Sequence, residues 1–521
     1  MTTRRDFMAL GASGLLGATG LPAVAADKSR VTADLVRLDA GIEPLVRLLE
    51  RTPRTQCVGM LAGQVRQGVP YRQLLAALFL AGIRNVNPQP PGYKFHCVFV
   101  IHAAHQLSLD LPADQRLLPL FWALDNFKVS QAKDIEEGDF NLAAVRGRLP
   151  APEKAWDEFR AAMADWDEQR ADRAIVALVR SRGAHEIIEG LWEYGARDYR
   201  NIGHKPIFVA NTWRTLQTIG WQHAEPALRS LVLGLLDYGK AERVNKFAFT
   251  DQVFLGNRRF VDAVMPPGSQ RSSSRWPANW SRPGSQVSRV SGLVEAMRSL
   301  DPHACCRLVG ERLGKGEFRA QAAWDAVHLM AGELMIRQPG IYGIHTVTSA
   351  NALHTAYQLA ALPATRLLLL LQAVGWMVQF REFMATTRGG LNKSDILVRP
   401  PGRQVKPRPD DSRSAIEAVL GAIGQDAGTA AAAARGLGEL AAASKQPALL
   451  GDFASAVRQL IARKATDAHH YKYGMAIFEN LDRVSPAFRP HVLAAAPYFL
   501  RGRKDPDTPV VTRALDALGA G

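Results

Sequence analysis

The stretch Leu367-Leu-Leu-Leu-Leu-Gln-Ala-Val-Gly-Trp-Met-Val378 indicates the class of the fold. It is apolar along its whole length, contains no charged residue and is interrupted by Gln372. The run is shorter than the roughly 20 apolar residues that a membrane-spanning helix needs. We therefore interpret it as a helix that is buried in a protein core.

Outward from this stretch, apolar residues recur at helical spacing along most long segments, and the alternation typical of strands is nearly absent. The sequence therefore predicts an all-α protein, built as a large helical bundle or as an array of helical hairpins. The predicted helices run from Val31 to Leu49, Tyr71 to Ala81, Val98 to Leu109, Pro152 to Ser181, Ile207 to Ile219, Ala224 to Leu236, Val287 to Leu300, Phe318 to Arg337, Ser349 to Ala361, Thr365 to Phe383, Ser412 to Ile423, Gly428 to Ala443, Ala448 to Ala465 and Tyr471 to Asn480.

The composition is that of an ordinary globular protein, with 521 residues, 47% of them hydrophobic and 22% charged. The formal net charge is +15, but basic residues are interleaved with acidic ones and form no block, so we expect no nucleic-acid partner. We predict one large helical domain over residues 27–521. Two stretches rich in Pro, Gly or Ser, near residues 265–287 and 399–412, are predicted to be loop insertions, either lids or surface loops.

Residues 1–26 have the pattern of a twin-arginine signal peptide. Thr3-Arg4-Arg5-Asp6-Phe7-Met8 resembles the export motif, a Gly- and Ala-rich apolar run follows, and Ala23-Val24-Ala25 suits a cleavage site. We therefore expect the twin-arginine translocase as a partner and a periplasmic or secreted location. We expect no stable membrane span in the mature protein.

The four cysteines argue against several cofactor classes. Four thiols in so long a chain do not make a disulfide scaffold. The sequence has no Cys-x-x-Cys-His, which excludes covalent c-type haem, and no Cys-x-x-Cys pair that would indicate a zinc ribbon or an iron–sulfur cluster. The cysteines are Cys57, Cys97, Cys305 and Cys306.

Four segments place a histidine where a turn leads into a helix. They are Tyr93-Lys-Phe-His96-Cys-Val, Ile202-Gly-His204-Lys-Pro-Ile, Gly343-Ile-His345-Thr-Val-Thr and Asp467-Ala-His469-His-Tyr-Lys472-Tyr. A bundle that gathers these junctions at one point would present four imidazoles, which suit iron and also zinc, copper or nickel. The alternative for each histidine is an ordinary core or surface residue with a hydrogen-bond partner.

Lys472 would add an anionic ligand to such a site. It lies three residues after His469, so the two side chains project from one face of a helix. A buried lysine loses much of its preference for the charged form. The neutral amine can take up carbon dioxide, and the resulting carbamate binds metal through oxygen. The adjacent His470 leaves open which of the two histidines is the ligand.

Other polar residues near these histidines are candidates for further roles. Asn211 and Arg214 follow His204 on one helix, and we predict that they orient a ligand or a substrate carbonyl as catalytic residues. His102 and His105 are three residues apart and could share a local metal. The threonines after His345 are expected to cap the following helix or to hold the second ring nitrogen.

The order and context of these segments resemble the questin oxidase-like family. The matching stretches are Phe95-His96 through Trp122 to Phe127, His204-Lys-Pro-Ile-Phe-Val-Ala210 with Arg214, His345-Thr-Val-Thr with Ala352-Leu353, and Asp467-Ala-His469-His-Tyr-Lys472. Together they span roughly residues 60 to 500.

The resemblance implies an all-helical enzyme that opens anthraquinone-type rings oxidatively with dioxygen, a reaction once described as Baeyer–Villiger-like and dependent on NADPH. It also implies a mononuclear non-haem iron held by His96, His204, His345, His469 and a carboxylated Lys472. Asn211 departs from the family, which tends to have a second histidine seven residues after the first. The export signal departs as well, because NADPH is scarce outside the cytoplasm.

Three functional hypotheses follow from the sequence. The first is an exported non-haem iron oxidoreductase that cleaves an aromatic or quinone-like substrate with dioxygen. The second is a non-catalytic secreted helical scaffold or binding protein. The third is a hydrolase or other metal enzyme that uses zinc at the same ligands, with Glu225 as a base.

Overall fold

The computed structural model describes residues 34–237, 249–266, 276–284, 286–398, 412–446 and 448–519. The chain from Ala33 to Gly521 forms one compact unit. The predicted signal peptide, residues 1–26, lies outside the described residues. So do residues 267–275 and 285 of the first predicted insertion and residues 399–411 of the second.

Within those ranges the protein consists of helices with no strand, so the all-α prediction is confirmed. The 22 α-helices are α1 (Glu43–Arg51), α2 (Arg54–Arg66), α3 (Tyr71–Asn85), α4 (His96–Leu109), α5 (Leu118–Glu137), α6 (Ala155–Asp165), α7 (Glu168–Ser181), α8 (Ala184–Ala196), α9 (His204–Ile219), α10 (Ala224–Leu235), α11 (Phe249–Val264), α12 (Val287–Ser299), α13 (Pro302–Gly314), α14 (Ala320–Arg337), α15 (Ile341–Leu359), α16 (Pro363–Thr387), α17 (Ser412–Ala422), α18 (Ala427–Ala443), α19 (Ala448–Lys464), α20 (Ala468–Arg483), α21 (Arg489–Leu493) and α22 (Pro509–Leu518).

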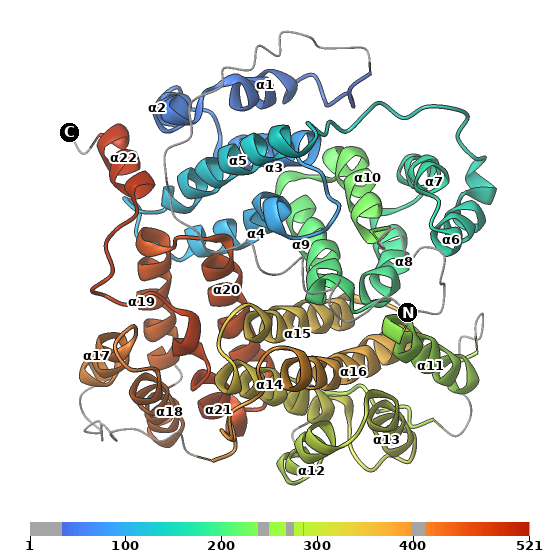
Figure 1. Cartoon of the computed structure of the whole chain (residues 1–521), viewed down its shortest axis with the longest axis vertical. Coiled ribbons are helices and arrows are strands. Elements are labelled where there is room, and N and C mark those ends of the chain that lie inside the picture. Colours follow the sequence, from blue (N-terminus) through green and yellow to red (C-terminus); the bar gives the residue numbers. More distant parts are fainter. Residues whose placement is uncertain are drawn as a thin grey trace. The chain divides into compact units, whose positions relative to one another are not determined.

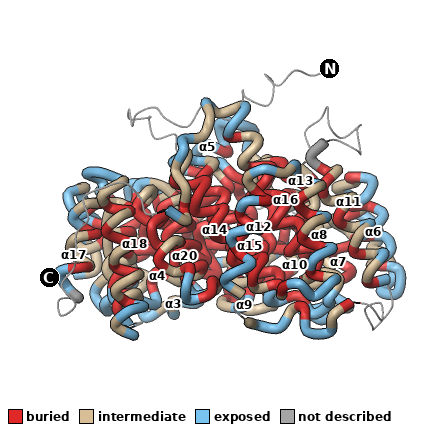
Figure 2. The backbone as a smooth tube through the Cα atoms, turned by 90° about the horizontal axis from the view of Figure 1, so that it is seen from below, coloured by how far each residue is buried: buried red, intermediate tan, exposed pale blue. Residues whose placement is uncertain are grey.

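Helix α16 carries the apolar stretch Leu367–Val378 and packs against α11, α13, α14 and α15 (Figure 2). A Cβ atom at Gly375 would lie 2.7 Å from Val253 Cγ1 and 3.0 Å from Cys306 Sγ, so the glycine permits this close packing. Among the described residues, α16 alone is long and apolar enough to cross a membrane, but 83% of its apolar window is buried inside the protein. That burial agrees with the predicted core helix.

Three predicted helices differ most from the structure in their limits. The segment predicted as one helix from residue 152 to residue 181 forms α6 and α7, because Trp166 adopts a left-handed backbone (φ 58°) that ends α6. Helix α15 begins at Ile341 and not at Ser349, so His345 lies inside the helix. Helix α1 begins only at Glu43, where Pro44 suits the first turn.

Four helices far apart in the sequence form a closed ring around the predicted metal site. Helix α9 packs against α4 and α15, and α20 packs against the same two helices (Figure 1). Each of the four carries a predicted ligand in its first two turns: His96, His204 and His469 stand at or next to the helix start, and His345 is the fifth residue of α15. The ring therefore brings the four imidazoles to one end of its interior.

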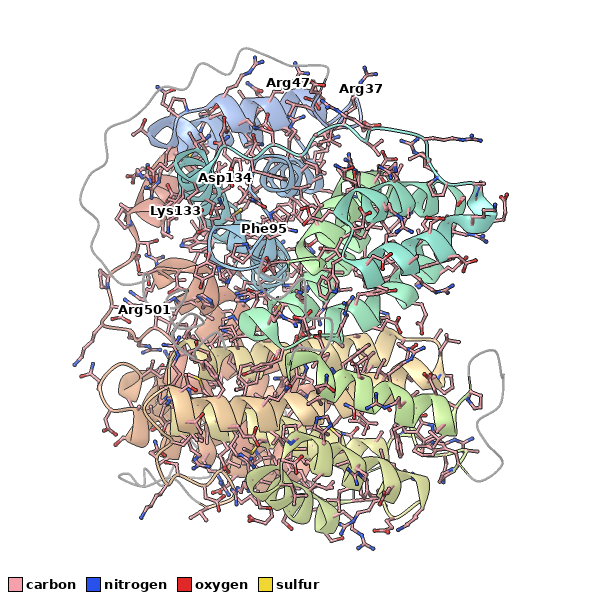
Figure 3. All side chains as sticks on the ribbon, turned by 45° about the vertical axis from the view of Figure 1, so that its right-hand side comes forward. Arg37, Arg47, Phe95, Lys133, Asp134 and Arg501 are labelled. Carbon is pink, nitrogen blue, oxygen red and sulfur yellow. The ribbon has the colours of Figure 1, made fainter. Side chains whose placement is uncertain are left out.

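The turn before His96 is held in place by α5. The buried Asp134 carboxylate accepts hydrogen bonds from the backbone N–H of Asn87 (2.9 Å) and of Phe140 (2.7 Å), and it pairs with Lys94 Nζ at 2.7 Å. The neighbouring Lys133 is exposed (Figure 3). Asp134 thus fixes the Pro- and Gly-rich turn from which α4 starts.

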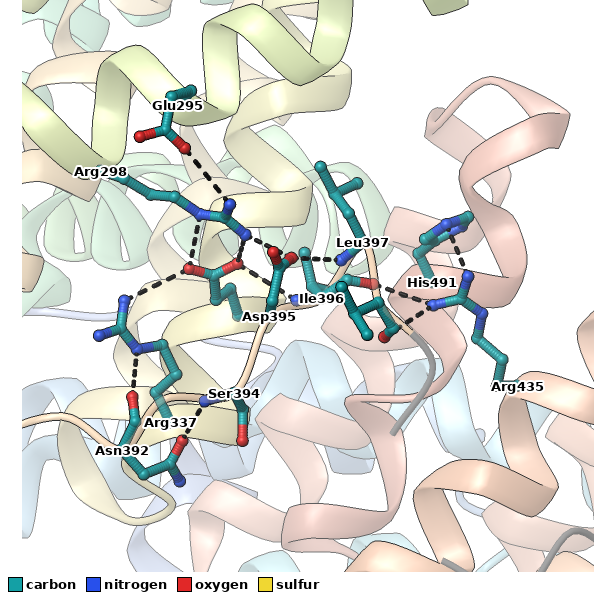
Figure 4. Close-up of polar contacts among 12 residues, drawn as sticks. Glu295, Arg298, Arg337, Asn392, Ser394, Asp395, Ile396, Leu397, Arg435 and His491 are labelled. Atoms are coloured by element: carbon teal, nitrogen blue, oxygen red, sulfur yellow. Dashed lines mark hydrogen bonds and ion pairs between the residues drawn. The ribbon is translucent and has the colours of Figure 1, made fainter. Parts of the chain in front are cut away.

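The chain that leads to the second insertion is fixed by charged groups (Figure 4). Arg298 on α12 donates from Nε to Glu333 on α14 at 3.0 Å and pairs with Asp395 at 2.5 Å. Arg435 on α18 donates to the carbonyl of Ile396 at 3.0 Å. The described flank of this insertion is therefore anchored to three helices.

Candidate metal centre

His96 and His204 are held in the same way, each by a backbone carbonyl three residues earlier. Nδ1 of His96 donates to the carbonyl of Tyr93, and Nδ1 of His204 donates to that of Asn201, both at 2.6 Å. Tyr93 and Asn201 adopt left-handed backbones (φ 46° and 58°), which are strained for non-glycine residues. Because a carbonyl can only accept, the proton of each ring resides on Nδ1 and Nε2 presents a lone pair.

His345 follows the same rule inside α15, with a carbonyl four residues earlier. Its Nδ1 donates to the carbonyl of Ile341 at 2.6 Å. The expectation that the neighbouring threonines hold this ring is wrong, because their hydroxyls face backbone carbonyls: Thr348 donates to Ile344 one turn earlier, and Thr346 lies within hydrogen-bond distance of the carbonyls of Gly343 and of Ala331 on α14. The helix itself therefore sets the tautomer of His345.

The three Nε2 atoms meet at one point. His204 Nε2 lies 3.0 Å from His96 Nε2 and 2.9 Å from His345 Nε2. With the Nδ1 protons committed to carbonyls, no neutral ring has a proton to place between these nitrogens. Burial and the other groups of the cluster lower the pKa of each ring well below its usual value, and the helix N-termini also oppose protonation. Three lone pairs at this separation fit a bound metal cation.

His469 supplies the fourth nitrogen. Asp467 caps α20 by accepting from the backbone N–H of His469 at 2.7 Å, and the same carboxylate oxygen lies 3.2 Å from His469 Nδ1. The ring centroid of His469 is 4.5 Å from that of His96, and its buried Nε2 has no hydrogen-bond partner among the described residues. The candidate ligand atoms of all four histidines lie within 4.8 Å of one another.

The ambiguity between the two neighbouring histidines is resolved by their directions. His470 stacks on Phe499, with ring centroids 4.7 Å apart and planes 15° apart. Its ring faces away from the cluster because successive residues of a helix point about 100° apart. His469 is therefore the residue that joins the other three imidazoles.

Lys472 lies beside the cluster, one turn beyond His469. It is buried, its Nζ lies 5.8 Å from the centroid of the Phe99 ring, and that nitrogen has no hydrogen-bond partner in the described chain. Burial lowers the pKa of Lys472 to about 7, although Asp467 acts to raise it. A neutral, unpartnered amine beside four imidazoles has the chemistry that carbamate formation needs.

Aromatic rings and a glycine close the site on its other sides. The Phe99 ring stacks near His204 with centroids 5.9 Å apart, and Phe208 packs 5.0 Å from Phe99. Gly92 has a φ of +124°, and a Cβ atom there would lie 3.0 Å from Cε1 of His204. Only glycine leaves space for this imidazole, so the turn before α4 shapes the site as well as the direction of His96.

On each of the four helices, the residues that follow the histidine at the same sequence spacing lie at the same level of the ring. The residues three positions after each histidine form a second layer, and those seven positions after form a third. A cavity of about 10 Å³, room for about one water molecule, lies between these layers. The second layer comprises Phe99, Ile207, Thr348 and Lys472; the cavity is lined by the last three with Asn211, Asn351, Ala352, Met475 and Ala476.

The two residues predicted to be catalytic occupy different places. Asn211 lines this cavity and donates from Nδ2 to the carbonyl of Phe99 at 3.0 Å. Arg214 does not line it: its Nη2 donates to Thr355 at 2.6 Å and to Glu479 at 2.9 Å, one layer further from the histidines. Asn211 is therefore the one placed to meet a small molecule next to Lys472.

Other candidates from the sequence lie outside the cluster. His105 lies 3.2 Å from the Tyr71 hydroxyl, and neither His102 nor His105 belongs to a group of three or more metal-ligating residues in the described chain. Glu225 forms an ion pair with Arg180 at 2.8 Å and belongs neither to the four-histidine group nor to the lining of the adjoining cavity.

Sequence reasoning missed the groups that hold the rings and the repeated register. No residue type marks a carbonyl acceptor, and the left-handed backbone of Tyr93 has no sequence signal. The register was detectable: alanine or asparagine follows each histidine by seven positions, as Ala103, Asn211, Ala352 and Ala476.

In comparisons with known proteins, no family model, no curated protein and no solved structure matches the chain.

Proposed function

We propose that the protein is a mononuclear non-haem iron oxidoreductase that acts on an aromatic or quinone-like substrate with dioxygen. The observation that supports this proposal is the convergence of three Nε2 lone pairs, at 2.9 and 3.0 Å, on a buried point that His469 also faces. The Nδ1 protons of the three rings are all held by carbonyls, so a cation is the partner that satisfies the inner nitrogens.

The identity of the metal depends on whether Lys472 is a ligand in addition to the four histidines. Four neutral imidazoles suit iron, zinc, copper and nickel alike. Lys472 separates these metals, because as a carbamate it would add one anionic oxygen and favour a metal of higher coordination number than tetrahedral zinc. Carbamate formation joins the Lys472 amine nitrogen to the carbon of CO₂ and releases one proton, and the neutral amine next to a small cavity suits this step.

Bound iron would supply the one-electron chemistry by which dioxygen reacts with an electron-rich aromatic ring. The protein's own groups have three tasks. The carbonyls of Tyr93, Asn201 and Ile341, with the Asp467 carboxylate, hold the Nδ1 protons and orient the rings. The phenylalanines exclude water from one side, and Asn211 presents its amide to the cavity beside Lys472.

The substrate class and the location rest on the sequence. The cavity is only about 10 Å³, so an aromatic ring must displace side chains to reach the histidines. The twin-arginine signal supports export to the periplasm or beyond, where NADPH is scarce, so the proposal includes no nucleotide donor.

A second candidate is a non-catalytic helical scaffold stabilised by a structural metal. The closure of the site favours it, because four nitrogens complete a tetrahedral shell and the adjoining cavity holds no more than about one water. This candidate predicts zinc at the histidines and a free Lys472.

Metal content is the measurement that tests the proposal. Full-length protein, exported by its host and purified without a His-tag or chelators, is analysed by inductively coupled plasma mass spectrometry. We expect about one iron per chain. One zinc per chain would support the structural site, and no metal after anaerobic loading with ferrous iron would overturn the metal centre.

A further inference from the structure

The register that places the four histidines continues to a fourth layer, ten residues after each of them. Arg214, Thr355 and Glu479 occupy this layer on α9, α15 and α20 and are joined by hydrogen bonds of 2.6 and 2.9 Å. Gln106 holds the equivalent position on α4. Ten residues of helix rise correspond to about 15 Å, so this layer stands well away from the rings.

A second cavity lies at this fourth layer. Its volume is about 30 Å³, three times that of the inner cavity. Asp110 and Arg458, which form an ion pair at 2.8 Å and are both partly exposed, stand at its outer side. The remaining lining residues are Gln106, Leu107, Met475 and Glu479.

Met475 is the residue that the two cavities share. It stands on α20 between Lys472, which lines the inner cavity, and Glu479, which lines the outer one. Asn351 of the inner cavity donates to Glu479 at 2.9 Å beside it. Met475 and the hydrogen bond from Asn351 to Glu479 therefore lie where the two cavities meet.

We infer that small molecules reach the histidine cluster along the axis of the four-helix ring, from the ion pair of Asp110 and Arg458, and that Met475 is the gate on this route. The inference deepens the proposed function and rests on it for the identity of what passes. Methionine suits the task, because its unbranched thioether side chain changes rotamer easily and adapts to aromatic neighbours. Neutral dioxygen and carbon dioxide can pass an apolar gate of this kind, whereas an aromatic ring must also displace other side chains, because the cavities are only about 10 and 30 Å³.

The test measures how fast a small reagent reaches Lys472 from solution. Cyanate is the probe: isocyanic acid, HNCO, adds across the lysine N–H to give a urea without a leaving group. The full-length chain is first freed of metal with a chelator, and the extent of carbamoylation of the Lys472 peptide is followed over time by mass spectrometry. Exposed lysines of the same chain give the reference rate.

We expect Met475→Ala to raise the rate at Lys472 about tenfold, the factor that removing a rotamer change from the route would give. Met475→Trp fills the partition and should lower the rate by a similar factor. Met163→Ala is the matched control, because Met163 is also buried but lies on α6, outside the ring. It should leave the rate unchanged.

Equal rates at Lys472 in all four proteins would overturn the gate, as would a Lys472 that reacts only when the whole chain unfolds. Neither result depends on metal, so either would leave the metal content as a separate question. If the gate behaves as expected but the protein contains no metal when it is purified without chelators, the route is preserved and the proposed oxidoreductase is removed. Circular dichroism on each variant establishes that the fold is intact.

Discussion

Imidazoles lie in contact at two buried places in the described chain, and the two places differ in where the protons lie. In the pair formed by α14 and α15, His328 Nε2 lies 2.8 Å from His354 Nδ1, and the His354 ring stacks on Trp324 with centroids 4.1 Å apart. Nδ1 of His328, on the far side of the ring from His354, has no hydrogen-bond partner among the described residues. One ring can therefore donate an N–H hydrogen bond to the other. This pair needs no cation.

The histidine cluster has almost the same nitrogen separations with the opposite proton arrangement. The outer nitrogens of His96, His204 and His345 all donate to carbonyls, so their inner nitrogens all present lone pairs. Short contacts between histidines are therefore not a sign of a metal site by themselves. The hydrogen bonds on the far side of each ring distinguish a ligand set from a core histidine pair.

The largest expected effect comes from removing one ring at each place. His204→Ala should abolish metal binding, because His204 lies within 3.0 Å of two of the other ligands and is the centre of the cluster. His354→Ala removes an equally buried imidazole and should retain the full metal content. Plasma mass spectrometry of both purified variants measures the metal per chain.

A His204→Ala protein with full metal content would contradict the cluster, and a loss of metal in both variants would point to a fold-wide effect. Circular dichroism separates these outcomes, because metal loss in a folded His204→Ala chain is a local effect. The comparison with His354 thereby controls for the cavity that an alanine leaves.

The next effect concerns the carboxylate that only the cluster possesses. Asp467→Asn retains a cap for α20 but replaces the anion that orients His469 Nδ1. Removing such an outer partner of a ligating histidine typically lowers metal affinity about 10- to 100-fold. A competition titration with a fluorescent chelator measures the change, and unaltered affinity would mean that Asp467 serves only as a cap.

The difference between the cap and the cluster also shows how far the sequence could lead. Asp467 was predictable as a helix cap, and the four histidines were predictable as candidates, because both signals are local, although His345 lies inside α15 and not at its start. Their convergence was not, since it depends on α4, α9, α15 and α20 packing as a ring across more than 370 residues. The position of Arg214 in the fourth layer could likewise not be predicted, because it depends on how α15 and α20 align with α9.

Local conformations that break a propensity set the limit for the fold. The helix predicted over residues 152–181 divides at Trp166, where the guanidinium of Arg197 lies 3.8 Å from the indole centroid and supports a left-handed backbone. Apolar periodicity continues across that point, so the sequence pattern alone indicates one helix. Tertiary contacts override the pattern there.

The pH dependence of stability is a third way to compare the two places. In the metal-free chain, burial and Lys472 lower the pKa of His469 to about 4, and burial lowers the pKa of His328 to about 3. The unfolded chain then binds more protons below about pH 6.5, so the free energy of unfolding rises with pH through this window. Each ring should contribute a slope of about 1.4 kcal/mol per pH unit.

Urea titrations measure these slopes between about pH 4.5 and about pH 6.5, and the upper limit is the pKa of histidine in the unfolded chain. His469→Gln and His328→Gln should each give a shallower slope than the parent chain without metal. With metal bound, only the cluster's slope should persist below about pH 4, where the metal-free His469 would take up a proton, because metal and protons compete for the same nitrogens. A metal-dependent change of slope that survives in His469→Gln would mean that the metal lies elsewhere.

The smallest expected effect comes from substituting His470, and it compares this residue with its neighbour His469 on the same helix. His470→Ala removes the stack on Phe499 and should lower the free energy of unfolding by about 0.5–1.5 kcal/mol, the range for aromatic pairs. Its metal content should equal that of the parent chain, whereas His469→Ala should lose metal. Both substitutions leave the Asp467 side chain in place to cap α20, so the helix start is a shared background. If the result is reversed, with metal lost only in His470→Ala, then α20 rotates by about 100° when metal binds and Lys472 no longer faces the cluster.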